Sequence, residues 1–464
     1  MKQPSNDRDL LILLASFVVS RFILFFVGIE MDYNALNVYW QYLSLDSLQN
    51  NLLHGVWYNH TQPPVFNLFL GSILKIFGSY SAVVFPIIFK LITVINVWLL
   101  YKNLQLLTPH SRIPLLLSLL YLLSPATMIL ESELFYTTFI TMLLLISSYS
   151  FLKFTKQPTY FYAWGILLPL AIACLTRSMY NLSWLMVITV VTIIYFRKTA
   201  LKQLGFVAAC CILLASSWYV KNYIVFGKFT TSTWLGMNLA RNVFHDHPVV
   251  DSTKIESIEP FSKISAYSKF ITASLADQYA GLNDAELLKE YKNGPHINEH
   301  HINYIEVSEK YADASKRFVQ AHPGDYLKNV LQSAVIFFAP ATRYPFAEVE
   351  ASKIKYYDLL YSFNMTHLAE GKNERRWAVL ISAIPKLIIY ATIFTIVLMA
   401  VKRTRTISAI NLFIVLTFMY IFTVSSLLEH YENMRFRFEI EPLFLLLLGQ
   451  VIAQWRSPTR LRKV

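Results

Sequence analysis

The chain has 464 residues, of which 55% are hydrophobic and only 15% charged, and its mean hydropathy is +0.42. Soluble chains carry roughly 25% charged residues, so this composition excludes a soluble multidomain protein, and so large an apolar share also excludes a disordered chain. The three cysteines lie inside apolar runs and two of them are neighbours, so no disulfide framework is visible. The remaining class is a polytopic membrane protein.

Ten apolar runs approach or exceed the length needed to cross a bilayer, which is about 20 residues. In chain order these runs are 10–29, 81–100, 113–130, 134–152, 160–176, 182–196, 203–224, 377–401, 408–427 and 440–455. They predict an all-α integral membrane fold, a polytopic bundle of about ten transmembrane helices. If all ten runs cross, both termini lie on the same side of the membrane.

Basic residues gather in the segments on the side of the termini. These segments are 1–9, 101–112, 153–159, 197–202, 402–406 and 456–464. They contain sixteen Lys and Arg residues, against which stand only Asp7 and Asp9. The asymmetry follows the positive-inside rule and predicts cytoplasmic termini. Topology therefore explains the net charge of +12, and no nucleic acid is expected as a partner.

Two long segments remain on the opposite side of the membrane. The first, 30–80, is acidic, and within it the apolar stretch 63–78 predicts a short helix lying in the membrane interface, with Pro63 and Pro64 at its first turn. The second, 225–376, is rich in charged residues, histidine and tyrosine and is expected to form an extracytoplasmic domain. It separates an N-terminal transmembrane region, 1–224, from a C-terminal transmembrane region, 377–464.

The first outer segment contains candidate catalytic and substrate-binding residues. Asp32 follows the first span directly, where a carboxylate could act as general base on a hydroxyl whose other substrate is dissolved in the bilayer. A solvated loop acid is the alternative interpretation. His60 and Gln62 offer imidazole and amide groups suited to sugar and phosphate contacts, although an interfacial aromatic belt explains the neighbouring Trp57 equally well.

Charged side chains also occupy the shorter outer loops. Glu131 and Glu133 lie in a turn between two spans, Arg177 ends another span, and Arg435 and Arg437 precede the last one. Ionisable groups at membrane depth usually face a cavity or a partner, and arginine can grip a phosphate with two parallel hydrogen bonds. Mutual salt bridging, for example between Glu432 and Arg435, is the alternative.

A cluster with metal-ligand chemistry lies in the second outer segment. It consists of His296, Glu299, His300 and His301, but its spacing matches no zinc signature, and a solvated loop is the favoured interpretation. The sequence also lacks a Gly-rich phosphate loop, a Walker motif and a serine nucleophile elbow. These observations leave ATP-driven transport unsupported.

Together these elements resemble the GT-C membrane glycosyltransferases, in particular the bacterial branch related to the protein O-mannosyltransferases and the lipid A aminoarabinose transferase. The elements that carry the resemblance, in the family's order, are Asp32, His60–Pro64, Ile76–Gly78, Leu175–Arg177, Trp218–Asn222, Phe226–Gly227, Gly236–Leu239, Asn242, and Arg435–Arg437 followed by Pro442. Tyr33 stands where the family often has a second acid, and Lys221 stands where arginine is common.

The resemblance implies a GT-C-like bundle that transfers a sugar from a polyprenyl-phosphate donor on the extracytoplasmic face, with inversion and without a covalent intermediate. Asp32 would deprotonate the acceptor hydroxyl. Donor phosphate would be held by Arg177 together with Lys221, Arg435 or Arg437, whereas Asn238, within Gly236–Leu239, would contact substrate. The acceptor would be a glycan, a lipid or a protein, neither a cofactor nor a divalent metal is expected, and the location would be the plasma membrane of a bacterium.

Two hypotheses from other classes stay open. A polytopic transporter or lipid flippase would also carry polar residues at membrane depth, but matched halves with broken helices are not found in the sequence. A non-catalytic assembly partner is the third hypothesis.

Overall fold

The computed structural model describes residues 6–109, 111–244, 284–289 and 291–456. Parts of the expected extracytoplasmic segment, 245–283 and residue 290, and of both termini lie outside the described residues. The described chain is almost entirely helical, with one two-stranded antiparallel sheet formed by β1 (Tyr291–Asn293) and β2 (His296–Ile297).

Six described segments are helical, long and apolar enough to cross a membrane: Asp7–Val27, Pro64–Leu107, Thr137–Lys156, Leu182–Phe226, Asn373–Thr404 and Ala409–Leu428. Two shorter apolar helices accompany them, Ile113–Leu122 and Tyr160–Thr176. The helices of the bundle are α1 (Asn6–Val27), α6 (Ser81–Leu107), α7 (Ile113–Leu122), α8 (Pro125–Leu130), α9 (Thr137–Lys156), α10 (Tyr160–Thr176), α11 (Leu182–Phe226), α19 (Lys372–Thr404), α20 (Ala409–Leu428) and α21 (Asn433–Arg456). The prediction of an all-α membrane-embedded protein is confirmed.

Helix α11 is 45 residues long but turns back on itself. Ala200, near its middle, has non-helical backbone angles (φ −150°, ψ 25°). The N–H of Leu182 donates to the hydroxyl of Tyr219 at 3.0 Å. In a straight helix these two residues would be about 55 Å apart at 1.5 Å per residue, so the two halves of α11 must lie side by side. The runs 182–196 and 203–224 therefore form a helical hairpin.

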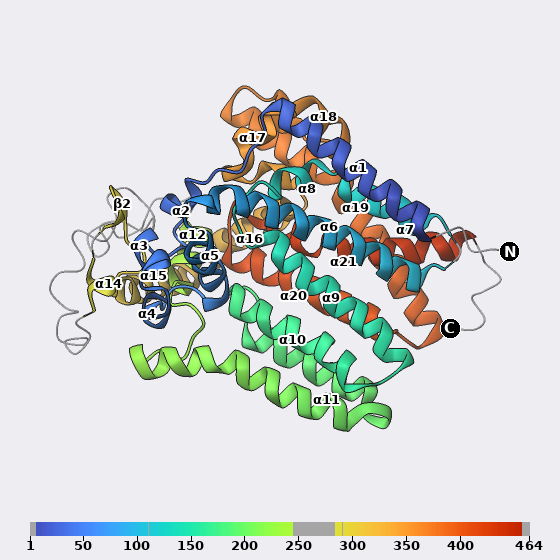
Figure 1. Cartoon of the computed structure of the whole chain (residues 1–464), viewed down its shortest axis with the longest axis horizontal. Coiled ribbons are helices and arrows are strands. Elements are labelled where there is room, and N and C mark those ends of the chain that lie inside the picture. The colour runs from blue at the N-terminus through green and yellow to red at the C-terminus, as the bar shows by residue number, and fades with distance from the viewer. Residues whose placement is uncertain (1–5, 110, 245–283, 290, 457–464) are drawn as a thin grey trace.

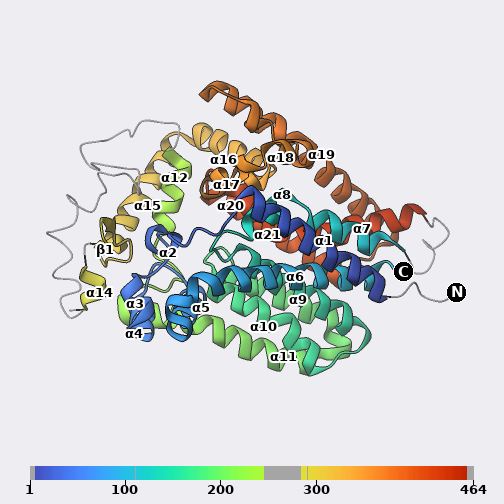
Figure 2. The ribbon, with the colours of Figure 1, turned by 45° about the horizontal axis from the view of Figure 1, so that its top comes forward.

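The smaller elements gather at one end of the bundle, opposite the end that holds both termini (Figure 1). They are α2 (Ala35–Val38), α3 (Leu45–Gln49), α4 (Leu52–Tyr58), α5 (Pro64–Phe77), α12 (Leu235–Phe244), α14 (Ala285–Leu288), the β1–β2 sheet and α15 (Tyr304–Ala321). Near the other end, the hydroxyl of Tyr101 in α6 donates to the carboxylate of Asp9 at 2.9 Å. Figure 2 shows the same separation from a second side.

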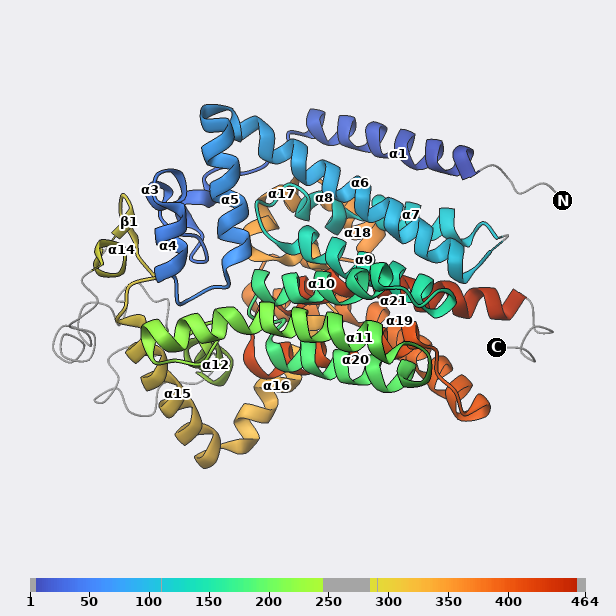
Figure 3. The ribbon, with the colours of Figure 1, turned by 60° about the horizontal axis from the view of Figure 1, so that its bottom comes forward.

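The chain returns from this outer layer to the bundle through α15 and α16 (Pro323–Phe337), which meet at a sharp bend (Figure 3). Gly236 in α12 allows α12 and α15 to approach closely, because a Cβ there would come 1.8 Å from the carbonyl oxygen of Ser308. Helices α17 (Glu348–Lys353) and α18 (Lys355–Ser362), together with four short 3-10 turns, complete the described structure; the turns are Gly78–Tyr80, Ala341–Arg343, Pro345–Ala347 and Met365–Leu368.

The expected short helix at 63–78 is present as α5, which begins at Pro64 and ends at Phe77. Pro64 occupies its first turn, where a missing N–H costs nothing, and Gly78 ends it with a φ of +53°. The chain then continues through a single 3-10 turn into α6. Whether α5 lies in the membrane interface stays a prediction.

Candidate functional site

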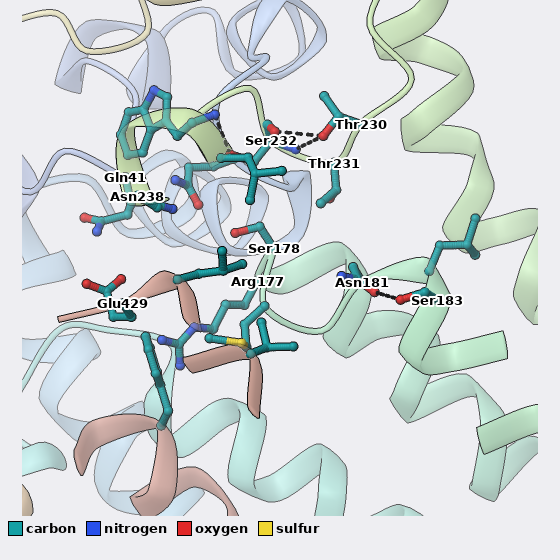
Figure 4. A pocket seen from close by; sticks show the side chains of 18 of the residues that line it. Gln41, Arg177, Ser178, Asn181, Ser183, Thr230, Thr231, Ser232, Asn238 and Glu429 are labelled. Atoms are coloured by element: carbon teal, nitrogen blue, oxygen red, sulfur yellow. Dashed lines mark hydrogen bonds between the residues drawn. The ribbon is translucent and has the colours of Figure 1, made fainter. Parts of the chain in front are cut away.

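A cavity of about 470 Å³ opens at the end of the bundle opposite the termini. Its wall is built from five parts of the chain: the first outer segment, Tyr136 just before α9, the turn between α10 and α11 with the start of α11, the stretch from the end of α11 to α12, and the stretch from the end of α20 to the start of α21. Figure 4 shows side chains from these parts projecting into one space. Four of the ten predicted site residues line it, namely Gln62, Arg177, Asn238 and Arg435.

Arg177 enters the cavity wall where α10 ends. The helix stops at Thr176, and Arg177 takes an extended conformation (φ −145°, ψ 130°) that directs the chain out of the helix. Its Nη1 forms a buried ion pair with the carboxylate of Glu439, and its guanidinium lies 3.8 Å from the ring centre of Phe436. The hydroxyl of Tyr180 donates to the other oxygen of Glu439 at 3.0 Å. Arg177 is thereby held in place beside the cavity.

Arg435 lies in the same wall and keeps unused hydrogen-bonding capacity. Its Nη2 donates to Oε2 of Glu432 at 2.6 Å, and its guanidinium lies 4.5 Å from the ring centre of Phe135 and 4.9 Å from that of Tyr344. Nε and Nη1 are buried and have no hydrogen-bond partner among the residues that the structure describes. Buried donors without partners are rare, and an anionic oxygen bound beside either N–H group would satisfy it.

The rest of the wall divides into a polar part and an apolar part. The polar side chains, besides the charged ones, are those of Gln41, Gln62, Ser178, Asn181, Ser183, Thr230, Thr231, Ser232 and Asn238, with Trp40 and Trp234 beside them. The apolar part comes mainly from the α11 hairpin and α20 and includes Leu182, Met186, Tyr219, Phe229, Val424 and Leu428. This division suits an amphipathic ligand with a polar, hydroxyl-rich, anionic head.

Two carboxylates are among the described residues of the wall, Glu429 and Glu432. Burial alone would raise the pKa of Glu432, but the positive charges of Arg435 and Arg241 hold that pKa below its usual value. For Glu429, burial raises the pKa in spite of Arg241, whose Nη1 lies 3.5 Å from Oε1 of Glu429. The two acids thus differ in basicity although they share one loop.

Asp32 lies outside this wall. It is exposed and accepts a hydrogen bond from the backbone N–H of Asn34 at 2.8 Å. Glu133 is also outside the wall but buried, and it accepts a hydrogen bond from the hydroxyl of Tyr39 at 2.7 Å. Burial raises the pKa of Glu133 to about 7, and the negative charges of Asp32 and Glu350 add to that rise. Asp32 and Glu133 therefore share one acidic region, and the role of Asp32 as base stays a prediction.

Four other predicted residues make contacts within the protein. Lys221 donates to the backbone oxygen of Asn59 at 2.6 Å, and its ammonium lies 3.5 Å from the ring centre of Trp218. Glu131 forms a buried ion pair with Arg21 of α1 at 2.8 Å. Arg437 donates to the backbone oxygens of Phe337 and Ala339 at the end of α16 and to Glu441, at 2.8, 3.3 and 2.7 Å. The contacts of Lys221, Glu131 and Arg437 thus connect helices and loops of the protein. His60 is the fourth residue, and it connects the two outer segments.

His60 joins the first outer segment to the second through a buried pair of histidines. Its Nδ1 is 2.7 Å from the hydroxyl of Thr233, and its Nε2 is 3.0 Å from the carbonyl oxygen of His300. The ring of His300 lies 2.5 Å from the hydroxyl of Thr61 through Nδ1 and 2.7 Å from the carbonyl oxygen of Tyr42 through Nε2. Burial lowers the pKa of both histidines to about 3, so both stay neutral in the folded protein.

Acidification should therefore weaken this junction. In the unfolded chain these histidines take up protons below about pH 6.5, whereas in the folded protein they stay neutral until about pH 3. The free energy of unfolding therefore decreases as pH falls from about 6.5 towards 3, by about 2 kcal/mol for each histidine at pH 5. The thermal midpoint of the detergent-solubilised protein should drop between pH 7.5 and pH 5. A double His60→Gln, His300→Asn variant should show a flatter pH dependence, and identical slopes for the two proteins would contradict the prediction.

The other members of the histidine cluster have partners within the protein. Glu299 pairs with the buried Lys292 at 3.2 Å, and His301 accepts a hydrogen bond from the N–H of Asn303 at 3.1 Å. Among the described residues, no three His, Cys, Asp or Glu side chains are grouped as metal ligands.

Sequence reasoning missed several residues of the site. Trp40, Gln41, Thr231 and Arg241 line the cavity, and none of them was proposed. Arg241 follows the Gly236–Leu239 element by two residues, and this proximity was the available signal. Comparison with known proteins gives no independent guide to these residues. No protein-family model, no curated protein and no solved structure matches this chain.

Proposed function

We propose that this protein is a membrane glycosyltransferase that transfers a sugar from a polyprenyl-phosphate donor to an acceptor on the extracytoplasmic face, with inversion at the anomeric carbon. The observation that carries the proposal is Arg435, whose Nε and Nη1 are buried in the wall of an amphipathic cavity without a partner among the described residues. Each of these two N–H groups can donate a charge-assisted hydrogen bond to an anionic oxygen, such as an oxygen of a phosphate. Arg177 adds a second guanidinium to the same wall.

The two sides of the cavity support a lipid-linked donor. The α11 hairpin and α20 supply apolar side chains to the wall, and Met186 at this side is itself 46% exposed on the surface of the bundle. A polyprenyl chain would lie along this side while the phosphate reaches the arginines. The sugar would then face the amide and hydroxyl groups of the polar part, with Trp40 and Trp234 as stacking surfaces.

In this reaction the acceptor oxygen attacks the anomeric carbon while the bond from that carbon to the phosphate oxygen breaks. The leaving phosphate gains negative charge, and Arg435 and Arg177 would stabilise it by hydrogen bonds and Coulomb attraction. The acceptor proton must go to a carboxylate. Asp32 is the acid that the resemblance implies.

The proposal includes a GT-C-like arrangement of about ten spans with both termini cytoplasmic, in the plasma membrane of a bacterium. The α11 hairpin supports this count, because it accounts for two crossings in one helical segment. The basic inner loops support the orientation.

Cysteine labelling tests the orientation. In a variant whose three native cysteines are replaced by alanine, Lys289→Cys should react with a membrane-impermeant maleimide in intact cells. Arg403→Cys, which is exposed at the other end of the bundle, should react only after permeabilisation. Labelling of the Arg403→Cys variant in intact cells would invert the orientation.

The function itself is tested with purified protein and a panel of undecaprenyl-phosphate hexoses and pentoses. Release of undecaprenyl phosphate together with a glycosylated acceptor from membrane extract supports the proposal. If the protein binds these lipids and moves them between leaflets without cleaving the sugar bond, the protein is a transporter or flippase instead.

A further inference from the structure

The proposed transfer needs a group that takes the acceptor proton within reach of the bound donor. A proton acceptor must approach the hydroxyl to about 2.6–3.2 Å, directly or through one water. Among the described residues of the cavity wall, only Glu429 and Glu432 carry carboxylates. Asp32 is exposed and is not among the residues that form the wall.

Glu432 is already engaged by a cation. Its Oε2 accepts a hydrogen bond from Arg435 at 2.6 Å, and the charges of Arg435 and Arg241 lower its pKa despite burial. Proton uptake by Glu432 would weaken this pair and release Arg435 from the position in which its free N–H groups face the donor phosphate. Glu432 is therefore a positioning residue for Arg435.

Glu429 is placed differently. It caps the end of α20 in an extended conformation (φ −130°, ψ 149°), and its side chain projects into the cavity with Arg177, Gln41 and Asn238 (Figure 4). Among the described residues, the carboxylate of Glu429 has two contacts, with the N–H of His430 at 3.0 Å and with Arg241 at 3.5 Å, and both involve Oε1. Oε2 therefore remains available to accept a hydrogen bond from a substrate hydroxyl.

We infer that Glu429 takes the proton from the acceptor hydroxyl, with Arg241 as its positioning partner; this inference rests on the proposed function. The hydroxyl proton passes to Oε2 of Glu429 while the hydroxyl oxygen forms its bond to the anomeric carbon. The bond from that carbon to the phosphate breaks, and its electron pair stays on the phosphate oxygen next to Arg435. Atoms and charge balance without a further reactant.

The surroundings of Glu429 suit this role. Among the described residues, Arg241, Glu432 and Arg435 are charged groups that act on its carboxylate, and Arg177 and Tyr136 line the same cavity. The 3.5 Å separation from Arg241 is long for an ion pair, so Arg241 keeps the carboxylate oriented without occupying it fully. Arg241 also lies 5.9 Å from the ring centre of Trp40, which connects this acid to the first outer segment.

The experiment compares Glu429→Gln with Asp32→Asn in single-turnover assays, using the undecaprenyl-phosphate sugar that the wild-type protein cleaves. A positioned general base contributes about 10²–10⁴-fold, so Glu429→Gln should lose that factor in rate while binding of undecaprenyl phosphate changes by less than about threefold. Asp32→Asn, which alters the acid that the resemblance implies, should lose much less of the rate than Glu429→Gln. Glu309→Gln, on the exposed face of α15, is the control.

Arg241→Gln provides a second readout. Without this cation the carboxyl of Glu429 should become harder to ionise, so the acid limb of the pH–rate profile of Arg241→Gln should move to higher pH. The residual rate of Glu429→Gln should lack that acid limb. Wild-type rates for Glu429→Gln, or a loss confined to Asp32→Asn, would overturn the inference and leave the proposed function intact. A wild-type protein that binds undecaprenyl phosphate but cleaves no sugar of the panel overturns both.

Discussion

Replacing Arg435 by lysine should reduce sugar transfer by about 10²-fold or more, because each oriented donor to a developing anion contributes on that scale. Lysine keeps the positive charge but offers a single flexible ammonium. It cannot hold Glu432 through one nitrogen and at the same time present a further N–H group in a fixed direction to a phosphate oxygen. The measurement is kcat/KM for the undecaprenyl-phosphate sugar that wild-type protein cleaves, with binding of undecaprenyl phosphate measured separately.

Arg375→Lys is the matched control for this substitution. Arg375 lies at the start of α19, and its side chain is 60% exposed in a 3.5 Å pair with Glu348. Exposed pairs of this kind contribute less than about 1 kcal/mol, so the control should change neither rate nor folding. If Arg435→Lys folds and keeps its donor binding and rate within about twofold, the phosphate of the donor is bound elsewhere.

The positions of the long helices could be predicted from the sequence because apolar runs of spanning length rarely occur for another reason. The predicted run 160–176 coincides with α10. The run 113–130 is instead broken into α7 and α8, because Ser124 precedes Pro125 and the residue before a proline avoids the helical region. That signal was present in the sequence.

The start of the last helix could not be obtained from hydropathy. The apolar run begins at 440, but α21 begins at Asn433, so its first turns contain Arg435, Arg437 and Glu439. A hydropathy window excludes such residues. In the folded chain Glu439 is neutralised by Arg177, which lies 262 positions away in sequence. Only the fold brings such a pair together.

The same limit applies to the candidate site. Arg177 and Lys221 both lie near the outer ends of spans, and nothing in the sequence distinguishes them. The fold directs Arg177 into the cavity wall and Lys221 towards the backbone of Asn59. Likewise Gln62 lines the cavity whereas His60, two residues earlier, binds Thr233 and His300. Residue types suitable for the chemistry can be predicted, but their neighbours cannot.

A second large effect is expected at the ion pair between Arg21 and Glu131. Arg21 lies in α1, in the mainly apolar part that follows the charged first turn, and its Nε and Nη2 both donate to the Glu131 carboxylate, at 3.2 and 2.8 Å. The two side chains are 6% and 2% exposed. Arg21 Nη1 also donates to the carbonyl oxygen of Leu122 at the end of α7 at 3.2 Å. The pair therefore fastens α1, which has a largely lipid-exposed surface, to the rest of the bundle.

Arg21→Met should destabilise the protein by about 3–5 kcal/mol, because it leaves the Glu131 carboxylate buried without its cation. The double variant Arg21→Met, Glu131→Leu should recover most of this loss, since apolar side chains of similar volume can replace a buried pair at little cost. The measurement is the thermal midpoint and the monodisperse fraction in detergent for the wild type, both single variants and the double variant. If Arg21 and Glu131 are coupled through their ion pair, the double variant is more stable than Arg21→Met alone. If the losses of stability in the two single variants simply add in the double variant, the two residues act independently and the prediction is wrong.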